Sequence, residues 1–304
     1  MKKVIVTTSI NPPTNAIRKF ETMTDWELVV IGDLKTPKDY DLSRGVFVTP
    51  AMQEKRDKEL SDAIGWNCIQ RRNFGLLWAH DMCADIIALV DDDNIPCEGW
   101  GRDLIVGKET EVNYYVTDLP VFDPVGATNY KHLWHRGYPL QLITQRDYSK
   151  KVKKKIKPDV QADFWNGDPD IDAICRMEHA PDCKFDEQCF PLASNRLSPF
   201  NSQNTFISGK MLKDYFLFPH VGRMDDIWAS YYVESKGYVV AYNKASVLQD
   251  RNIHDLIKDM KAEYIGYENN LKIVNELRSS SDAILKYLPE KSQQAFKLYQ
   301  RNFS

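Results

Sequence analysis

The sequence predicts an α/β protein built on a doubly wound, mostly parallel sheet, and two observations lead to that prediction. Segments with strand and helix patterns alternate over residues 1–100, as in folds that place helices on both faces of a parallel sheet. The apolar run Ile86–Val90 ends directly in Asp91, Asp92 and Asp93. A continuous aliphatic run that stops at charged residues is typical of a strand buried on both faces.

The other elements of the first half follow in order. A first strand is expected at residues 4–8, and the Asn-Pro-Pro-Thr turn after it leads into a helix that begins near Asn15. Aliphatic residues predict a second strand at 26–31 and a weaker third strand at 46–49. Apolar residues at helical spacing then predict a helix from about residue 69 to 83, directly before the strand that ends in the aspartates.

The second half has a looser pattern. Residues 113–210 are rich in proline, glycine, asparagine and aromatic residues, which indicates short strands and long connections that share one sheet with the first half. The segment 150–157 holds six lysines and is expected to be a solvated loop, with docking of an anionic partner as the alternative. An amphipathic helix is expected at 253–277, and a short final helix follows a break at 279–281.

Charge and hydropathy exclude two classes of protein. The net charge of -3 gives no basic face for nucleic acid. No apolar stretch approaches the ~20 residues that a membrane-spanning helix needs. The chain is therefore expected to be soluble and cytoplasmic, and aromatic residues near Tyr264 and Tyr267 suggest a homodimer formed through a helix.

The last three cysteines raise the question of a structural metal. With one histidine they form a spaced set, namely Cys175, His179, Cys183 and Cys189. A zinc site is one interpretation, but the paired cysteine knuckles of such sites are missing, so a loop with ordinary thiols is the other.

The three consecutive aspartates predict a ligand site. Ligands of open α/β sheets bind just beyond the carboxyl ends of the strands, where Asp91, Asp92 and Asp93 are expected to lie. Clustered carboxylates repel one another unless a cation lies between them, and a hard divalent cation that also contacts phosphate oxygens fits this need. An acidic turn before the next element is the alternative, since Asp-Asn-x-Pro is also good turn chemistry.

Two polar groups are candidates for holding a nucleotide near these aspartates. Thr8, Asn11 and Asp33 follow the first two strands, where neighbouring strand ends suit a base and a ribose. The sequence Arg71-Arg72-Asn73 begins the helix before the aspartate strand, and guanidinium groups at a helix N-terminus suit a diphosphate. Common turn residues and surface arginines are the respective alternatives.

Two further groups are candidates for binding and activating a sugar or its acceptor. Carboxylates and amides beside aromatic residues suit sugar hydroxyls, and the candidates are Asn166, Asp168, Asp170, Asn201, Gln203 and Asn204. Asp225 and Asp226 begin an aromatic segment, and one of them is a candidate general base, with a helix N-cap as the alternative. His254 could complete the metal site, although a lone histidine is more often structural.

The order of these segments resembles the STELLO-type glycosyltransferase family over most of residues 4 to 275. The matching stretches are VTTSINPPT (6–14), VIGD (30–33) with KTP (35–37), RN (72–73) with Gly75, DDDN (91–94), RGYPL (136–140), NGDPDIDA (166–173), PFNSQNT (199–205), DIW (226–228) and QDRN (249–252) with His254. A more distant resemblance is to reversibly glycosylated polypeptides, the UDP-arabinopyranose mutases, which share the triple aspartate, Arg-Gly-Tyr-Pro and Arg-x-Asp-Asp-x-Trp.

These resemblances imply a GT-A fold with Asp91 and Asp93 on a Mn²⁺ or Mg²⁺ ion and a UDP-sugar as donor. The implied reaction is sugar transfer to a glycan or another hydroxyl acceptor. Asp226 is the first candidate for the base, which implies inversion. Asp225 in that role, or a retaining reaction without a protein base, are the alternatives. Residues 1–110 would form the donor half, 111–255 the acceptor half and 256–304 a helical extension. The alternatives are a mutase in which Arg136 becomes glycosylated, and a non-catalytic nucleotide-sugar-binding partner in polysaccharide synthesis.

Overall fold

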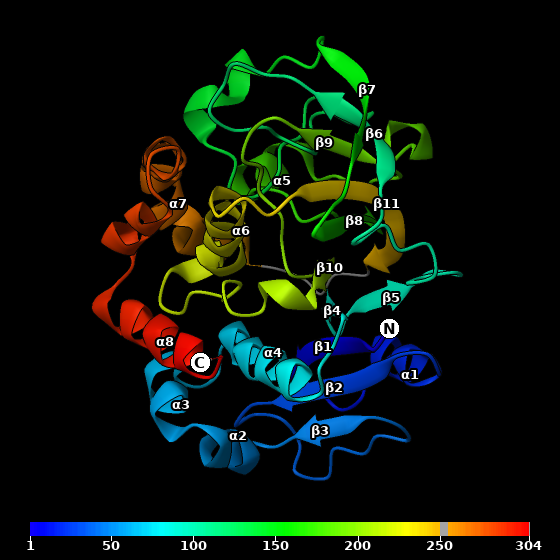
Figure 1. The fold of residues 1–304 in the computed structure, drawn as a ribbon, viewed down its shortest axis with the longest axis vertical. Helices are drawn as coiled ribbons and strands as arrows, with labels where there is room; N and C mark the ends of the chain where they lie inside the picture. Colours follow the sequence, from blue (N-terminus) through cyan, green and yellow to red (C-terminus); the bar gives the residue numbers. More distant parts are fainter. Residues whose placement is uncertain (250–254, 304) are drawn as a thin grey trace.

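The computed structural model describes residues 1–249 and 255–303, and one sheet runs through both halves of the chain. The strand order is β3-β2-β1-β4-β10-β8-β11-β9-β6-β7, and β5 pairs with β11 beside this path. Figure 1 shows the strands in this order from β3 at the bottom to β7 at the top. The expected α/β class with a shared sheet is confirmed.

The first half has the predicted elements. Its strands β1 (Lys3–Ser9), β2 (Glu27–Gly32), β3 (Val46–Val48) and β4 (Ile86–Val90) pair in parallel. Every residue of β4 is buried, as its aliphatic run requires. Helix α1 (Asn15–Glu21) follows β1, and α4 (Arg72–Asp81) precedes β4.

Two short helices between β3 and α4 were not predicted. Helix α2 (Pro50–Arg56) begins after Thr49, whose side chain accepts a hydrogen bond from the Met52 amide, and Pro50 occupies its first turn. Helix α3 (Lys58–Ile64) begins after Asp57, which caps the Leu60 amide in the same way. Both starts carry the usual capping signals, but the segments are short and lack a clear apolar face.

The second half adds mixed strands. They are β5 (Asn94–Pro96), β6 (Thr110–Tyr115), β7 (Lys151–Ile156), β8 (Val160–Gly167), β9 (Leu192–Ser194), β10 (Asn204–Ser208) and β11 (Val240–Gln249). The lysine-rich segment is therefore strand β7, and the loop prediction was wrong. β7 is the last strand of the sheet order and its lysines are exposed, so the strand needs no second apolar face.

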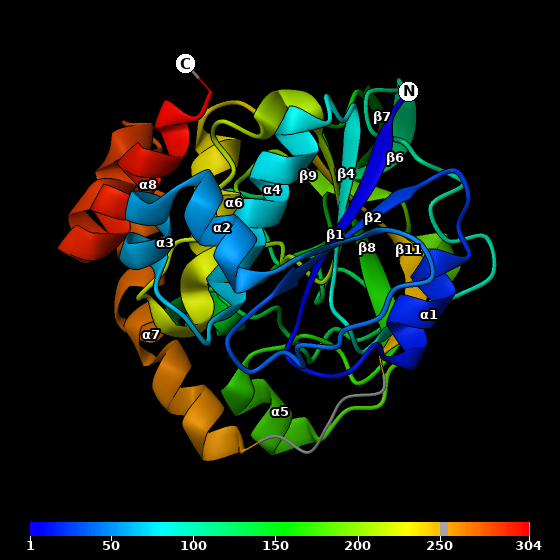
Figure 2. The same ribbon diagram turned by 90° about the horizontal axis from the view of Figure 1, so that it is seen from below.

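The remaining helices are α5 (Ala173–His179), α6 (Asp225–Ser235), α7 (Leu256–Leu277) and α8 (Glu290–Arg301). Short 3₁₀ helices cover Ile69–Arg71, Leu140–Gln145, Glu187–Cys189, Gly209–Met211, Gly222–Met224 and Ser281–Tyr287. In Figure 2, α4, α6, α7 and α8 lie on one side of the sheet and α1 on the other. Among the described residues, no helix combines the length and apolarity needed to cross a bilayer.

Strand directions decide where the polar segments meet. β10 runs antiparallel to both β4 and β8, and β11 runs parallel to β8. The carboxyl ends of β1, β2, β4, β8 and β11 therefore lie at one edge of the sheet, together with the amino end of β10. This carboxyl edge collects the segments that follow β1, β2 and β4 and the segment that precedes β10, as expected for the ligand edge of an α/β sheet.

Candidate active site

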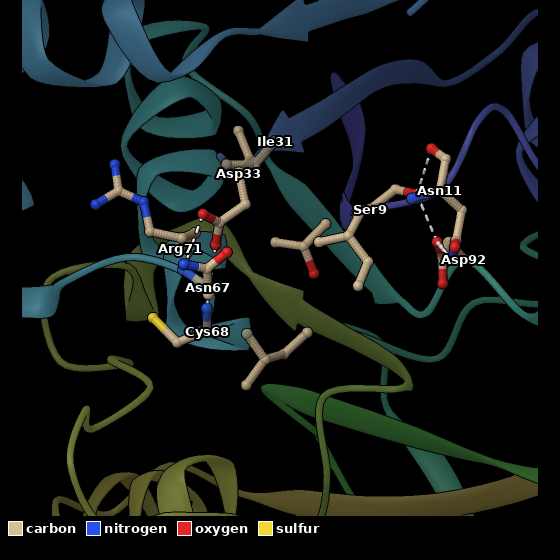
Figure 3. A pocket seen from close by; sticks show the side chains of 11 residues that line it. Ser9, Asn11, Ile31, Asp33, Asn67, Cys68, Arg71 and Asp92 are labelled. Atoms are coloured by element: carbon tan, nitrogen blue, oxygen red, sulfur yellow. Dashed lines mark hydrogen bonds between the residues drawn. The ribbon is translucent and has the colours of Figure 1, made fainter. Parts of the chain in front are cut away.

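A cavity of about 300 Å³ lies at the carboxyl edge, between the ends of β1 and β2 and the segment before α4. It is lined by Thr8, Ser9, Ile10, Asn11, Ile31, Asp33, Asn67, Cys68, Ile69, Arg71 and Asp92. In Figure 3, Asp33, Asn67, Cys68 and Arg71 lie on one side and Asn11 and Asp92 on the other. The structure thus brings together four residues predicted to hold a nucleotide, and we name this space the first cavity.

Asp33 fixes one wall of the first cavity. Its carboxylate accepts hydrogen bonds from the backbone amides of Asn67 at 2.8 Å and Cys68 at 3.1 Å. Asn67 has a φ of 58°, a left-handed conformation that asparagine tolerates better than most residues. The carboxylate keeps further lone pairs for a ligand, because each of its oxygens can accept more than one hydrogen bond.

Arg71 supplies a buried positive charge to the same wall. Its Nε donates to Gln53 at 2.8 Å, its Nη1 donates to Ser61 Oγ at 3.1 Å, and its guanidinium lies 3.6 Å from the Trp66 ring centre. Its Nη2 has no hydrogen-bond partner among the described residues. Burial lowers the pKa of Arg71 to about 10, so the group stays cationic at neutral pH.

The first two of the three aspartates have different partners. Asp91 accepts a hydrogen bond from Arg72 Nη2 at 2.6 Å, and the fully buried Arg72 also donates to Ser202 Oγ at 2.9 Å. Asp92 accepts from Ser9 Oγ at 2.5 Å and Asn11 Nδ2 at 3.2 Å, so it ties the end of β1 to the end of β4.

Arg72 was predicted to hold the diphosphate directly. The structure instead encloses it behind Asp91, and Arg71 is the arginine that lines the first cavity. The difference arises because α4 turns its first residues toward the sheet, where the Arg72 guanidinium meets the carboxylate and the loop of Ser202.

The predicted metal ligands Asp91 and Asp93 are both partly buried after β4, but His254 lies outside the described residues. Within 1–249 and 255–303, no three histidine, cysteine, aspartate or glutamate side chains form a group that could hold a metal ion. The donors available are two carboxylates, which are hard oxygen ligands. They fit a Mg²⁺-type ion that takes its other ligands from substrate phosphates and water, rather than a closed protein cage.

The zinc interpretation of the later cysteines also has no ligand group in this part of the chain. Cys175 and Cys183 are buried, and the backbone of Cys183 pairs with Gly167. His179 packs its ring against those of His132 and Trp134. Cys175, His179 and Cys183 therefore have packing roles, and the described side chains do not form a zinc ligand set.

A second cavity of about 180 Å³ adjoins the first. It is lined by Ile69, Asp91, Arg136, Ser202, Gln203, Gly222, Arg223, Asp225 and Asp226. Ile69 lines both cavities, while Asp92 faces the first and Asp91 the second. The aspartate turn therefore lies at the boundary between a space with a buried arginine and a space rich in carboxylates.

Arg136 is the centre of the second cavity's buried charge network. Its Nε and Nη2 donate to Asp170, at 3.0 and 2.8 Å, and its Nη1 and Nη2 donate to Asp226, at 3.0 and 3.1 Å. Nη1 also donates to the Arg223 carbonyl. Burial lowers the pKa of Arg136, but the two carboxylates outweigh this effect and hold that pKa well above its usual range.

The two acids that begin α6 differ in their surroundings. Asp226 accepts from Arg136 and also from the Ser202 amide at 2.9 Å. Asp225 accepts a side-chain hydrogen bond from Gln70 Nε2 at 2.8 Å. Burial, reinforced by the negative charge of Asp226, raises the pKa of Asp225 to about 7.

The predicted sugar-binding residues divide into two sets. Asn201 Nδ2 donates a hydrogen bond to Asp170 Oδ2 at 3.0 Å behind the second cavity, and Gln203 lines this cavity. Asp168 is paired with Arg176 outside both cavities. Asn166 instead accepts a hydrogen bond from the Phe185 amide.

Two amides chosen from the sequence have structural partners. Asn204 is fully buried, accepts from Trp100 Nε1 at 2.9 Å and donates to the Phe164 carbonyl at 3.0 Å. Asn73 is also fully buried and exchanges two hydrogen bonds with the backbone of Leu217, both at 2.9 Å. Neither lines the two cavities, because such amides in the core must satisfy neighbouring backbone groups.

Sequence reasoning missed several residues of the first cavity. Asn67, Cys68 and Ile69 were not predicted, although Gly65, which has a φ of 82°, signals a turn just before them. This turn places the chain beneath Asp33, about 35 residues away in sequence.

Comparison with models of known protein families finds no match. Two curated proteins of Arabidopsis thaliana are similar to the chain. Probable glycosyltransferase STELLO1 is 25% identical over 275 residues, which cover 82% of this chain and 36% of that protein. Probable glycosyltransferase STELLO2 is 24% identical over 304 residues, which cover 92% and 40%. The resemblance to STELLO-type proteins is thus confirmed, and the chain spans about two fifths of these relatives' length.

Proposed function

We propose that the chain is a glycosyltransferase that binds a nucleotide-sugar, a UDP-sugar foremost, and transfers its sugar to a hydroxyl acceptor. The observation that carries the proposal is the pair of adjoining cavities at the carboxyl edge. In the first, the Asp33 carboxylate offers acceptors for a base or ribose, and the buried guanidinium of Arg71 adds a positive charge to the wall beside the expected diphosphate. The similarity to two probable glycosyltransferases supports this assignment.

The residues between the cavities suit the diphosphate. Asp91 and Asp93 would hold a Mn²⁺ or Mg²⁺ ion, which supplies charge neutralisation for the leaving nucleoside diphosphate. Arg72 orients Asp91 from behind through their 2.6 Å hydrogen bond. We assign Arg72 a positioning role for this reason.

Asp225 is the better candidate for the general base. Asp226 is committed to Arg136 and Ser202, whereas Asp225 has a pKa of about 7 and lines the second cavity. A base titrating near the working pH is the most effective. In the transfer step, the acceptor oxygen forms a bond to the anomeric carbon, its proton passes to Asp225, and the bond from that carbon to the diphosphate oxygen breaks with inversion.

The mutase alternative requires a free nitrogen on Arg136. Every N–H group of this guanidinium has an acceptor among Asp170, Asp226 and the Arg223 carbonyl, so glycosylation would break a buried charge network. This geometry favours transfer over the mutase reaction. A chain that binds donor without turnover remains the second candidate, because the relatives extend well beyond the length matched here.

A thermal-shift screen of nucleotide-sugars with and without Mn²⁺ tests the donor site. Hits are then assayed for release of nucleoside diphosphate over an acceptor panel. Metal-dependent binding with turnover supports the glycosyltransferase. Binding without turnover supports the non-catalytic candidate, and stable label on Arg136 from a radiolabelled donor would favour the mutase. No binding by any nucleotide-sugar would overturn all three.

A further inference from the structure

A cavity of about 480 Å³ lies on the opposite edge of the sheet from the proposed active site. Its lining comes from the end of β7 with Lys157, from β9 and the segment after it, and from the turn between α6 and the start of β11. Because β8 and β11 begin where this cavity lies and end at the carboxyl edge, the eight residues of β8 place the two sites about 25 Å apart. The volume lies within the range of about 300–1,000 Å³ typical of small-molecule sites.

Three cations from two segments border this far cavity, namely Lys154, Lys157 and Arg196. Among the described residues, none of them has a carboxylate within ion-pair distance, whereas Lys150 and Lys155 of the same region pair with Asp118 and Glu109. Lys154 Nζ is 4.1 Å from the Tyr114 ring centre, which holds its charge at the cavity wall. The cavity is therefore positively charged.

The rest of the lining is suited to hydroxyl groups. Ser194, Asn195, Ser198 and Tyr238 contribute polar side chains. The Glu234 carboxyl accepts hydrogen bonds from the Ser198 amide at 2.9 Å and from its hydroxyl at 3.3 Å. Burial raises the pKa of Glu234 well above its usual range, which favours the uncharged form of this carboxyl and weakens its repulsion of an anion.

We infer that this far cavity binds an acidic sugar, meaning a saccharide that carries a carboxylate or phosphate. The lysines and the planar guanidinium of Arg196 face the anionic group, while the serine, asparagine and glutamic acid side chains exchange hydrogen bonds with ring hydroxyls. An isolated phosphate would engage the cations and leave the rest of this polar lining uncovered, although Asn195 and Ser198 also bond the Thr117 backbone and Glu234 within the protein. The inference does not depend on the proposed transfer reaction, since the two sites lie on opposite edges.

The test is calorimetric titration of the full chain with digalacturonate, glucose 6-phosphate, inorganic phosphate and a neutral disaccharide. The two acidic sugars are expected to bind at least about tenfold more tightly than inorganic phosphate or the neutral sugar. Binding of digalacturonate alone or glucose 6-phosphate alone identifies the anionic group that the cavity selects. Equal affinity for phosphate, or absence of binding by both acidic sugars, overturns the inference.

Strand β7 and Lys157, the residue after it, offer a matched pair of variants. Lys154→Gln with Lys157→Gln removes two charges at the cavity, and Lys153→Gln with Lys155→Gln removes two from the same strand. Alternate residues of a strand point to opposite faces, so Lys153 and Lys155 lie away from Lys154. The first variant is expected to weaken binding at least about tenfold and the second less than about twofold. Equal losses would show non-specific attraction and overturn the site.

Discussion

Arg136 and Asp226 form a two-pronged ion pair inside the protein, with Nη1–Oδ1 and Nη2–Oδ2 distances of 3.0 and 3.1 Å. The residues are 90 positions apart in sequence, and both are almost completely buried. Their pairing joins the RGYPL and DIW segments at the second cavity. Because Asp226 is held in this pair, Asp225 is the aspartate of α6 that remains available as a general base.

Arg136→Met is expected to destabilise the fold strongly, because it leaves Asp170 and Asp226 buried without their cation. Loss of one partner from a buried charge network typically costs about 3–5 kcal/mol. Urea denaturation measures this change. Arg56→Met is the control, since the Arg56–Asp81 pair is partly exposed and is expected to contribute less than about 1 kcal/mol. Similar losses for both variants would contradict the central role of Arg136.

Asp93→Asn is expected to weaken Mn²⁺-dependent UDP binding at least about tenfold, because an amide is a poorer ligand than a carboxylate for a hard cation. Binding of UDP without metal should change little. Calorimetry with and without Mn²⁺ separates the two effects, and Asp62→Asn on the exposed face of α3 serves as the control. Unchanged metal-dependent binding would remove Asp93 from the proposed site.

Asp225→Asn is expected to retain donor binding and lose turnover by at least about 10²-fold, the usual scale for a general base. In the wild type, turnover should rise with pH through about 7, since Asp225 acts in its deprotonated form. Gln70→Met removes a hydrogen bond that stabilises this carboxylate, so the rise should move to higher pH. A pH–rate profile that does not shift in this variant would reassign the base.

Asp163 gives a pH-dependent contribution to stability. Burial raises the pKa of Asp163 to about 7 although Ser246, Gln161 and Asn243 hydrogen-bond to it. The folded state therefore holds a proton that the unfolded chain releases near its ordinary pKa of about 3.9, and this stabilisation is lost as pH rises through about 7. Between about pH 5 and pH 8, the wild type should lose about 1–3 kcal/mol more than Asp163→Asn in urea denaturation. Parallel stability curves would contradict the buried, protonated state.

Gly75→Ala tests the close packing of α4 on β1. A Cβ at this position would lie 2.2 Å from Val6 Cγ1. The strand that carries Val6 is held in the sheet and cannot move away easily. The expected loss is about 1–3 kcal/mol, typical of overpacking. Adding Val6→Ala should recover part of it, and a double-mutant cycle measures the coupling. Additive losses would show that the two residues do not clash.

Local patterns were sufficient for the first half of the fold. The aliphatic runs of β1, β2 and β4 and the apolar spacing of α4 depend on residues close in sequence, and these elements lie where they were expected. β7 was missed because its lysines and two apolar residues resemble a solvated segment, and only its pairing with β6 makes it a strand. The helices α2 and α3 were too short to show a periodic face.

Local sequence patterns are enough to predict the α/β class and the gathering of acids and amides beyond the strand ends, because strand direction sends these ends to one edge. Packing in three dimensions was needed to place Arg71 in the lining of the first cavity and Arg72 behind Asp91, and to pair Arg136 with Asp226 and not with Asp225. Neighbours in sequence share the same local pattern. The charge states of these neighbouring residues depend instead on burial and on partners tens of residues away. Both burial and partners follow from packing in three dimensions.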